Sequence, residues 1–491
     1  MRKLLLSGVL LVTIAAQGQK IANPTPFAKT ITADDLKRHL YIVAGKEMEG
    51  RLTASPGQRK AAEYIQNEFK KLGLQAGNKG EFEQHFPVYQ DSIISASFEV
   101  NGKQYEIDKD FNASTGNIPA TLRFSEIVFI GAKTTDTIKN ANLAGRLVLM
   151  IGGAGQPGGG GIMTTLASKG VVGVITVQSN YPRTTPANRK GGQTTNTFRR
   201  TITPQQYTIS EAVARDILGS EFDNAKANTS TYKIFQSNIS LDTRKTTITT
   251  ESSNVLGYME GTDLKDQYLF ITAHYDHLGK RDSVIFYGAD DDGSGTCAVI
   301  ELAEAFAKAK AAGKGPRRTI VFMTVSGEEE GLWGSAFYGD HPAFPLDKTT
   351  VDLNIDMIGR IDPKRKVGDS MNYVYVVGDD KLSSDLKPIS ESMNKKYTKL
   401  ELDYKYNDPK DQERIYFRSD HFNFARKGVP IIFYFNGTHA DYHRPTDTPD
   451  KINYDLYAKR AQLVFYTAWE MANRNDMLKR DIPLDNPFMN R

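Results

Sequence analysis

Strongly apolar segments alternate with helix-like segments over the second half of this 491-residue chain. From residue 252 onward, the β-type runs include QYLFITAHYD, TIVFMTV, TVDLNIDMIG, NYVYVVG and VPIIFYF. Segments with helical spacing separate them, among them TCAVIELAEAFAKAKAAG and a stretch from about Lys381 to Asn394. Alternation of this kind predicts a three-layer α/β/α sandwich with a mostly parallel central sheet. In such sheets a ligand site lies beyond the carboxyl ends of the strands.

The chain divides into four segments by its sequence pattern. Residues 1–18 have a basic start, an apolar stretch and then small residues, which predicts a secretory signal peptide, with a membrane anchor as the alternative. Residues 19–89 have helical spacing, with Ser55 and Pro56 as the start of one helix. Residues 90–248 hold short β-type runs and many turn residues, which predicts a β-rich inserted domain. Residues 249–491 form the predicted α/β domain.

Composition argues against some classes of partner. The formal net charge is +4, so neither a nucleic acid nor an acidic membrane surface is indicated as a partner. After the leader, no stretch is apolar enough to span a membrane. Cys297 is the only cysteine, so an intrachain disulfide is impossible. The fold must therefore depend on its core, or on metal.

Residues that can bind metal ions follow the predicted strands. FITAHYDHLG places His274 and Asp276 on one face of an extended segment, with His277 expected on the other face. The remaining motifs are GADDDGSG (with Asp291 in its centre), SGEEEGLWGS (with Glu328, Glu329 and Glu330), LNIDMIG (with Asp356) and DYHRPTDT (with Tyr442 and His443).

Each motif alone has an ordinary explanation, such as a helix cap or a solvated acidic loop. Together they supply two histidines and at least three carboxylates at the ends of strands. That set suits two divalent cations, of which Zn²⁺ fits best, with cobalt and manganese as alternatives.

The order and spacing of H-x-D, G-A-x-D-x-x-S-G, E-E-x-G-L-x-G-S, D-M and Y-H-x-x-x-D-T resemble the co-catalytic dizinc exopeptidases. This family includes bacterial leucyl aminopeptidase, glutamate carboxypeptidase and plasma carboxypeptidase-like enzymes. The resemblance extends over residues 252–475 and, less closely, over the helices around EGRLTASPG. Residues 90–248 resemble the protease-associated insert domain that many members carry.

The resemblance implies a role for each matching residue. The predicted metal ligands are His274, Asp291, Glu329, Asp356 and His443, with Asp291 bridging the two ions. Asp276 would orient His274, and Glu328 would be the general base. Tyr442 would donate to the oxyanion, while Asp290 and Asp292 would be turn or capping residues.

The implied function is that of an exported exopeptidase, most of all an aminopeptidase, which hydrolyses peptides or dipeptides with a water activated by two Zn²⁺ ions. A carboxypeptidase or dipeptidase of the same family is an alternative, which an arginine cluster containing Arg360 and Arg418 would favour. Further alternatives are a glutaminyl-cyclase-like transferase, suggested by SDHFNF with Asp420 and His421, a receptor-like scaffold and a dimetal phosphatase. His439 is expected to support the site. The destination of export is the periplasm or the extracellular medium.

Overall fold

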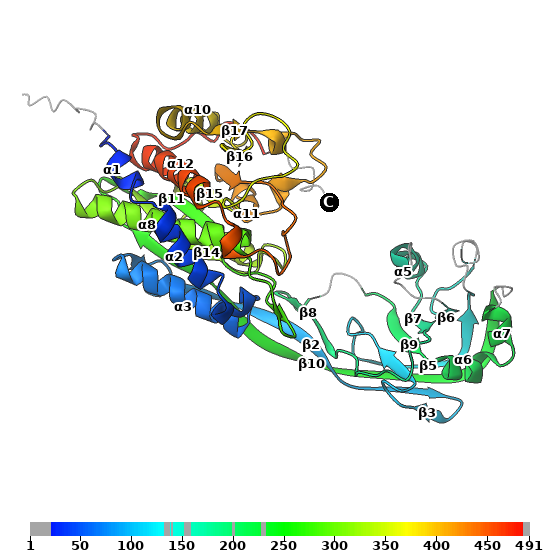
Figure 1. The fold of residues 1–491 in the computed structure, drawn as a ribbon. Coiled ribbons are helices and arrows are strands. Elements are labelled where there is room, and N and C mark those ends of the chain that lie inside the picture. Colours follow the sequence, from blue (N-terminus) through cyan, green and yellow to red (C-terminus); the bar gives the residue numbers. More distant parts are fainter. Residues whose placement is uncertain are drawn as a thin grey trace, which may run out of the picture. The chain divides into compact units, whose positions relative to one another are not determined.

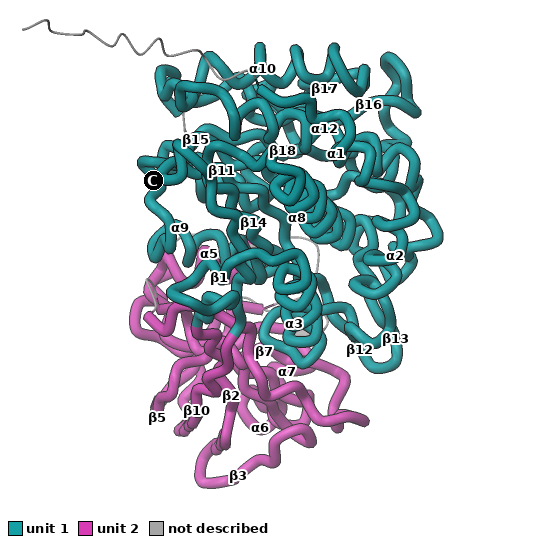
Figure 2. The backbone as a smooth tube through the Cα atoms, turned by 90° about the vertical axis from the view of Figure 1, so that its left-hand side faces the viewer, with its two compact units in different colours: residues 1–86, 252–491 teal, residues 87–251 magenta. Residues whose placement is uncertain are grey.

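The computed structural model describes residues 21–131, 138, 141–151, 159–198, 202–226 and 232–484. They form two compact units, one made of residues 1–86 and 252–491 and the other of residues 87–251 (Figure 2). The chain enters the second unit within β2 (Glu83–Val100) and leaves it within β10 (Lys233–Met259). The second unit differs by three residues at each end from the predicted insertion, residues 90–248. The predicted signal peptide lies outside the described residues.

The larger unit is built on a mostly parallel sheet. Its strand order is β17–β16–β18–β15–β11–β14–β10. The central strands β14, β11, β15 and β18 run parallel to one another. Strand β10 is antiparallel to β14, and β16 is antiparallel to β18 but parallel to β17. The strand bounds are β11 Leu264–His274, β14 Arg318–Val325, β15 Thr349–Ile355, β16 Tyr373–Val377, β17 Glu401–Asp403 and β18 Ile431–Phe435.

Helices cover both faces of this sheet because its strands are apolar on both sides. In β14, Ile320 and Phe322 enter one core, whereas Val321 and Met323 enter the other. One core is covered by α2 (Ala33–Val43), α3 (Pro56–Lys71), α8 (Gly295–Ala311) and α12 (Tyr454–Asn473) (Figure 1). The opposite core receives side chains from α9 (Trp333–Asp340) and α11 (His421–Ala425). The predicted α/β sandwich is confirmed.

Local signals explain where several of these helices begin. The hydroxyl of Ser55 accepts a hydrogen bond from the backbone N–H of Gln58, and Pro56 occupies the first turn, so α3 starts as predicted. The helix expected from about Lys381 to Asn394 begins later: α10 spans Leu386–Met393 and is followed directly by the π-helical turn η4 (Asn394–Thr398). Leu382 has φ of +64°, a left-handed conformation that a helix cannot continue through.

The smaller unit has its own core and is β-rich. Strand β5 (Ala120–Phe129) pairs antiparallel with β10 and parallel with β6 (Leu147–Ile151), which continues to β7 (Gly173–Val177) and β9 (Gln205–Ile209). The unit also contains β3 (Lys103–Tyr105), β4 (Phe111–Ala113), β8 (Lys190–Thr194), α5 (Gly159–Ser168), α6 (Glu211–Leu218) and α7 (Glu221–Lys226). Its identity as a protease-associated domain stays a prediction. No helix in the described part of the chain combines the length and hydrophobicity that a membrane span requires.

Candidate metal centre

The parallel strands bring the predicted site residues to one edge of the sheet. His274 is the last residue of β11, and Asp356 directly follows β15. Glu328 and Glu329 lie in the loop between β14 and α9, and His443 lies in the loop between β18 and α12. Asp291 belongs to the irregular turn η2 (Ala289–Ser294) that leads into α8.

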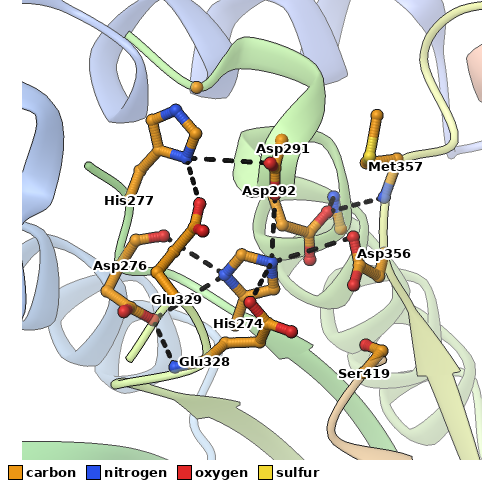
Figure 3. A network of polar contacts seen from close by, with 12 residues as sticks. His274, Asp276, His277, Asp291, Asp292, Glu328, Glu329, Asp356, Met357 and Ser419 are labelled. Carbon is orange, nitrogen blue, oxygen red and sulfur yellow. Dashed lines mark hydrogen bonds and ion pairs between the residues drawn. The ribbon is translucent and has the colours of Figure 1, made fainter. Parts of the chain in front are cut away.

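One group of donor atoms surrounds the imidazole of His274. Its Nε2 atom lies 3.3 Å from Oδ1 of Asp291, 3.7 Å from Oδ1 of Asp356 and 3.9 Å from Oε2 of Glu328 (Figure 3). The side chain of Glu328 is 13% exposed, and that of His274 is buried. Three carboxylates therefore converge on one buried ring nitrogen.

A second group of donor atoms lies on the other side of Asp291. Nε2 of His443 is 3.1 Å from Oδ2 of Asp291 and 3.0 Å from Oε2 of Glu329. Each of the two oxygens of Asp291 thus faces a different histidine, as a bridging carboxylate would require.

His277 also lies in this second group, so its predicted position on the other face is wrong. Its Nδ1 atom is 2.7 Å from Oε1 of Glu329 and 3.9 Å from Oδ2 of Asp291 (Figure 3). The alternation argument fails because β11 ends at His274, and the residues after it no longer follow the geometry of a strand.

Asp276 contacts its surroundings through both carboxylate oxygens. Oδ1 accepts the backbone N–H of Glu328 at 3.2 Å, and Oδ2 accepts the hydroxyl of Thr53 at 2.7 Å. Nδ1 of His274 lies closer to the backbone oxygen of Asp276, at 3.2 Å, than to its carboxylate, at 3.7 Å. Asp276 therefore joins the His274 strand to the Glu328 loop.

The neighbours of Asp291 hold the turn around it. Oδ1 of Asp292 accepts the backbone N–H groups of Gly295 and Met357, and Oδ1 of Asp290 accepts that of Gly359. The carboxylate of Asp447 accepts the backbone N–H groups of Asp290 and Asp291. These bonds tie the aspartate turn to the segment after β15 and to the loop after β18.

Small residues are needed where the backbone passes close to these loops. A Cβ atom on Gly334 would lie 2.2 Å from Oδ1 of Asn254 and 2.4 Å from the backbone oxygen of Ser326. The backbone N–H of Gly334 donates to that same oxygen. The glycine in the GLWGS motif therefore lets α9 fold back against the loop that carries both glutamates.

Arg51 connects the N-terminal helices to the site. Its fully buried guanidinium donates hydrogen bonds to the backbone oxygens of Val43, Tyr275, Tyr287 and Gly288 at 2.7–2.9 Å. Two of these acceptors flank the site, one beside His274 and one at the start of the aspartate turn.

The acidic groups dominate the electrostatics of the site. Burial alone would lower the pKa of His274, but the charge of Glu328 and contacts with Asp276 and Asp291 raise it well above its usual value. Burial also opposes the charged form of His443, yet contacts with Asp291 and Glu329 raise its pKa to about 10. Burial raises the pKa of Glu328 well above its usual value, and neighbouring carboxylates add to the rise. The site therefore favours positive charge at its histidines.

The unpaired atoms of the site fit metal ligands. The buried side-chain atoms without a hydrogen-bond partner include Nε2 of His274, both ring nitrogens of His277, Oδ2 of Asp291 and Oε1 of Glu329. Unpaired buried polar atoms cost free energy, and their clustering at one place indicates a ligand that they share. Imidazole nitrogens and carboxylate oxygens are donors that zinc accepts.

A pocket opens beside the donor atoms. It is lined by Asp291, Glu328, Asp356, Met357, Ile415, Arg418, Phe433, Phe435, Thr438 and Tyr442. Tyr442 stacks on His443 with ring centroids 3.9 Å apart, and its hydroxyl accepts a hydrogen bond from Arg418 at 3.1 Å. The lining therefore combines apolar side chains with three of the predicted site carboxylates.

The remaining candidates lie around the site or away from it. Nε2 of His439 lies 3.1 Å from Oδ2 of Asp290, so His439 contacts the aspartate turn. Arg360 pairs with Asp441 at 2.9 Å rather than joining Arg418 in a cluster. His421 bonds to the backbone oxygen of Tyr416 and stacks on Phe433, so the structure does not bring it into the donor groups.

The sequence did not indicate the roles of several site residues. His277 was named as a candidate but was expected on the face opposite His274. Asp447 was part of the Y-H-x-x-x-D-T motif, but its carboxylate role on the aspartate turn depends on the fold. Arg51 and Thr53 lie in the segment EGRLTASPG, but Tyr275 and Asp276, which they contact, are more than 200 residues away, so the segment alone does not indicate these contacts.

Comparison with known proteins agrees with this geometry. The sequence model of peptidase family M28 matches residues 254–468. A probable leucine aminopeptidase of Trichophyton verrucosum is 29% identical over 214 residues, which cover 42% of this chain and 55% of the relative. A probable zinc metalloprotease of Pyricularia oryzae is 27% identical over 264 residues, or 45% of this chain and 50% of the relative. The chain thus spans about half the length of the curated relatives it matches.

Two solved structures share the fold over nearly their whole length. An aminopeptidase from an Aneurinibacillus species is 18% identical with a TM-score of 0.55, covering 95% of this chain and 98% of that one. A zinc aminopeptidase from Bacillus subtilis is 18% identical with a TM-score of 0.53, covering 92% and 99%. The segment that the model of peptidase family M28 matches, residues 254–468, carries His274, Asp291, Glu329, Asp356 and His443.

Proposed function

We propose that this protein is a zinc-dependent aminopeptidase that releases the N-terminal residue of peptides. The observation that carries the proposal is the pair of donor groups that share Asp291, with His274 on one side and His443 on the other. The names of the relatives, which include aminopeptidases and zinc metalloproteases, support the same activity.

In this proposal His274, Asp356 and Asp291 would hold one zinc ion, and Asp291, Glu329 and His443 would hold the other. Two such ions, when bound, lower the pKa of a water molecule toward about 7 and stabilise negative charge on the substrate. Asp276 fixes the loops that carry His274 and Glu328, through the contacts described above.

Glu328 is the proposed general base. Its carboxylate lines the pocket beside Asp291 and Asp356 and is itself 13% exposed. It takes a proton from the water whose oxygen attacks the scissile carbonyl carbon. As the C–N bond breaks, the same proton passes to the leaving amine nitrogen.

Tyr442 is proposed to stabilise the oxyanion. Because its hydroxyl oxygen accepts a hydrogen bond from Arg418, its own proton can be directed at the substrate. Burial raises the pKa of Tyr442, which keeps that proton in place at neutral pH. The hydroxyl and the cations would then share the negative charge of the tetrahedral intermediate.

The apolar residues that line the pocket suggest which substrates are preferred. Met357, Ile415, Phe433 and Phe435 line it next to the donor atoms. A side chain of leucine or methionine size would lose water contact there, which favours apolar N-terminal residues. Among the described residues that line the pocket, Arg418 is the single cation. An enzyme that binds an acidic terminus would be favoured by a cluster of arginines, so the single arginine supports an aminopeptidase.

A panel of substrates tests the activity. Purified protein is depleted of metal with a chelator, restored with zinc, and assayed on leucyl anilide, on its N-acetyl form, and on dipeptides with free or amidated C-termini. We expect zinc-dependent cleavage that requires a free N-terminus. A requirement for a free C-terminus would instead indicate a carboxypeptidase, and Arg418 would be the next residue to change. Loss of all cleavage with two zinc ions bound would contradict both.

Export is proposed as well. The basic, apolar and small residues of positions 1–18 support it. Mass spectrometry of the N-terminus of the mature protein tests this: cleavage near Gly18 is expected, and an intact Met1 on the cellular protein would contradict it.

A further inference from the structure

His277 is a buried histidine whose ring faces the second donor group. Its side chain is fully buried, and its ring centroid lies 6.0 Å from that of His443. Nδ1 is the ring nitrogen that faces Glu329 and Asp291. No role follows for it from the motifs that predicted the other ligands.

The chain around His277 is shaped to hold the ring in this place. The backbone N–H of His277 donates to the backbone oxygen of Arg51 at 3.2 Å. Gly288 has φ of +55°, and a Cβ atom on it would lie 2.5 Å from Cδ2 and Cγ of the ring. The ring therefore packs against a position where only glycine leaves it room.

The geometry distinguishes a ligand from a hydrogen-bond donor. Nδ1 of His277 lies 2.7 Å from Oε1 of Glu329, yet neither atom has a partner that satisfies hydrogen-bond geometry. An N–H bond that donated to Glu329 would point along the line between the two atoms. The two atoms instead lie side by side, as two ligands of one ion do.

The distances among the four candidate ligands also fit one ion. Ligands of a tetrahedral zinc ion lie about 2.0–2.1 Å from the metal and hence about 3.3 Å from one another. His443 lies 3.0 Å from Glu329 and 3.1 Å from Asp291, and His277 lies 2.7 Å and 3.9 Å from the same two residues. His277, Asp291 and Glu329 also form one of the groups of potential ligands whose donor atoms all lie within 4.8 Å of one another.

We propose that Nδ1 of His277 is a fourth protein ligand of the zinc ion held by Asp291, Glu329 and His443. The inference rests on the proposed function, because it requires two bound cations. It makes the two ions unequal: the one at His443 has a closed set of protein ligands, whereas the one at His274 and Asp356 keeps an open position for substrate. Closed sets are typical of tightly held ions, and open positions are typical of catalysis.

Zinc titration of metal-free protein tests the proposal by calorimetry. The variants are His277→Ala and His277→Asn, and the control is His341→Ala, which removes an exposed histidine at the end of α9. Wild type and control should bind two equivalents. His277→Ala should keep one site and lose at least about 100-fold in affinity at the other, since loss of a residue that merely supports a ligand costs about 10–100-fold.

The asparagine variant separates the two roles of His277. Its amide can donate to Glu329 but is a poor zinc ligand, so it should bind zinc as weakly as the alanine variant. Restored affinity in His277→Asn would overturn the proposal, because it would show that His277 only positions Glu329. Unchanged affinity in both variants would overturn it equally.

X-ray absorption at the zinc edge of the wild-type protein gives a readout that needs no variant to fold. Three imidazoles shared by two zinc ions are expected, and two imidazoles would overturn the proposal. In that case, cleavage of leucyl anilide by the dizinc protein would leave the proposed function standing. Wild-type protein that binds fewer than two zinc ions would instead contradict the proposed function itself.

Discussion

The three adjacent glutamates illustrate how position decides the role of a residue. Glu328 and Glu329 face the donor groups, whereas Glu330 is exposed on the same loop. Their side chains are chemically identical, so only the backbone turn after β14 separates them. Their neighbour Gly327 has φ of +80°, which helps to set that turn.

Replacing Glu328 with alanine should leave zinc binding intact and reduce kcat by about 10²–10⁴-fold, the usual contribution of a general base. Glu330→Ala is the matched control and should retain wild-type kcat. The measurements are zinc content and steady-state hydrolysis of leucyl anilide. Near-normal turnover by Glu328→Ala would show that another group takes the proton.

His421 should make folding stability depend on pH. Burial lowers the pKa of His421 to about 3, whereas in the unfolded chain it is about 6.5. Between these values the unfolded chain binds a proton that the folded chain does not, so the stability that this residue contributes is lost as pH falls below about 6.5. The maximum slope is about 1.4 kcal/mol per pH unit.

Urea unfolding of zinc-free wild type and His421→Gln at pH 7.5 and pH 5.0 checks this expectation. The stability of wild type should fall more between the two pH values than that of the variant. His341→Gln, an exposed histidine, should follow wild type. Parallel pH dependence of wild type and His421→Gln would contradict the argument.

At the scale of elements, the sequence predicted the strands more accurately than the helix ends and loops that follow them. Strands such as β14 and β18 are continuous apolar runs, so composition alone marks them. The helix α10 begins later than predicted because Leu382 has a left-handed backbone conformation. The helix propensities of the residues do not indicate that conformation. His277 was predicted on the wrong face because the alternation of a strand was applied beyond His274, where β11 ends.

The predicted ligands could be assigned to one site because the carboxyl ends of parallel strands lie at one edge of the sheet. This is a property of the fold and not of any single motif. Their roles stay predictions, and the geometry adds the contacts through which each would act. The contacts of Thr53 and Arg51 could not be predicted from EGRLTASPG, because their partners are distant in sequence and are partly backbone oxygens. Such contacts depend on tertiary packing alone.

The packing of α9 against the glutamate loop should be sensitive to one methyl group. Gly334→Ala should destabilise the protein by about 1–3 kcal/mol, since its Cβ would meet backbone and a buried amide. A Cβ on Gly339 in the same helix would meet a flexible lysine side chain at 3.4 Å and a backbone oxygen at an ordinary 3.9 Å, so Gly339→Ala should be neutral or stabilising by up to about 1 kcal/mol. Midpoints of chemical denaturation measure both. Equal effects of the two changes would refute the steric argument.

At the scale of the whole molecule, the candidate metal groups belong to one unit. Among the described residues, the groups of potential ligands all lie within residues 1–86 and 252–491. Each unit has a core of its own, so the two can unfold in separate transitions. Metal binding should then stabilise only the larger unit.

Differential scanning calorimetry with and without zinc tests this expectation. A ligand at 100 times its Kd stabilises the state that binds it by about 2.7 kcal/mol. We expect chelation to lower the Tm of one transition and to leave the other unchanged. Movement of both transitions together would mean that the units do not unfold independently.

The buried guanidinium of Arg51 limits how far the chain could be shortened without loss of support for the candidate metal centre. A recombinant protein starting at residue 254, where the family match begins, would contain every predicted zinc ligand. It would nonetheless lack the cation that ties together the carbonyls beside His274 and the aspartate turn, and the hydroxyl that holds Asp276. The residues that support the candidate metal centre are therefore discontinuous in sequence, and truncation to the segment that the family model matches would remove part of that support.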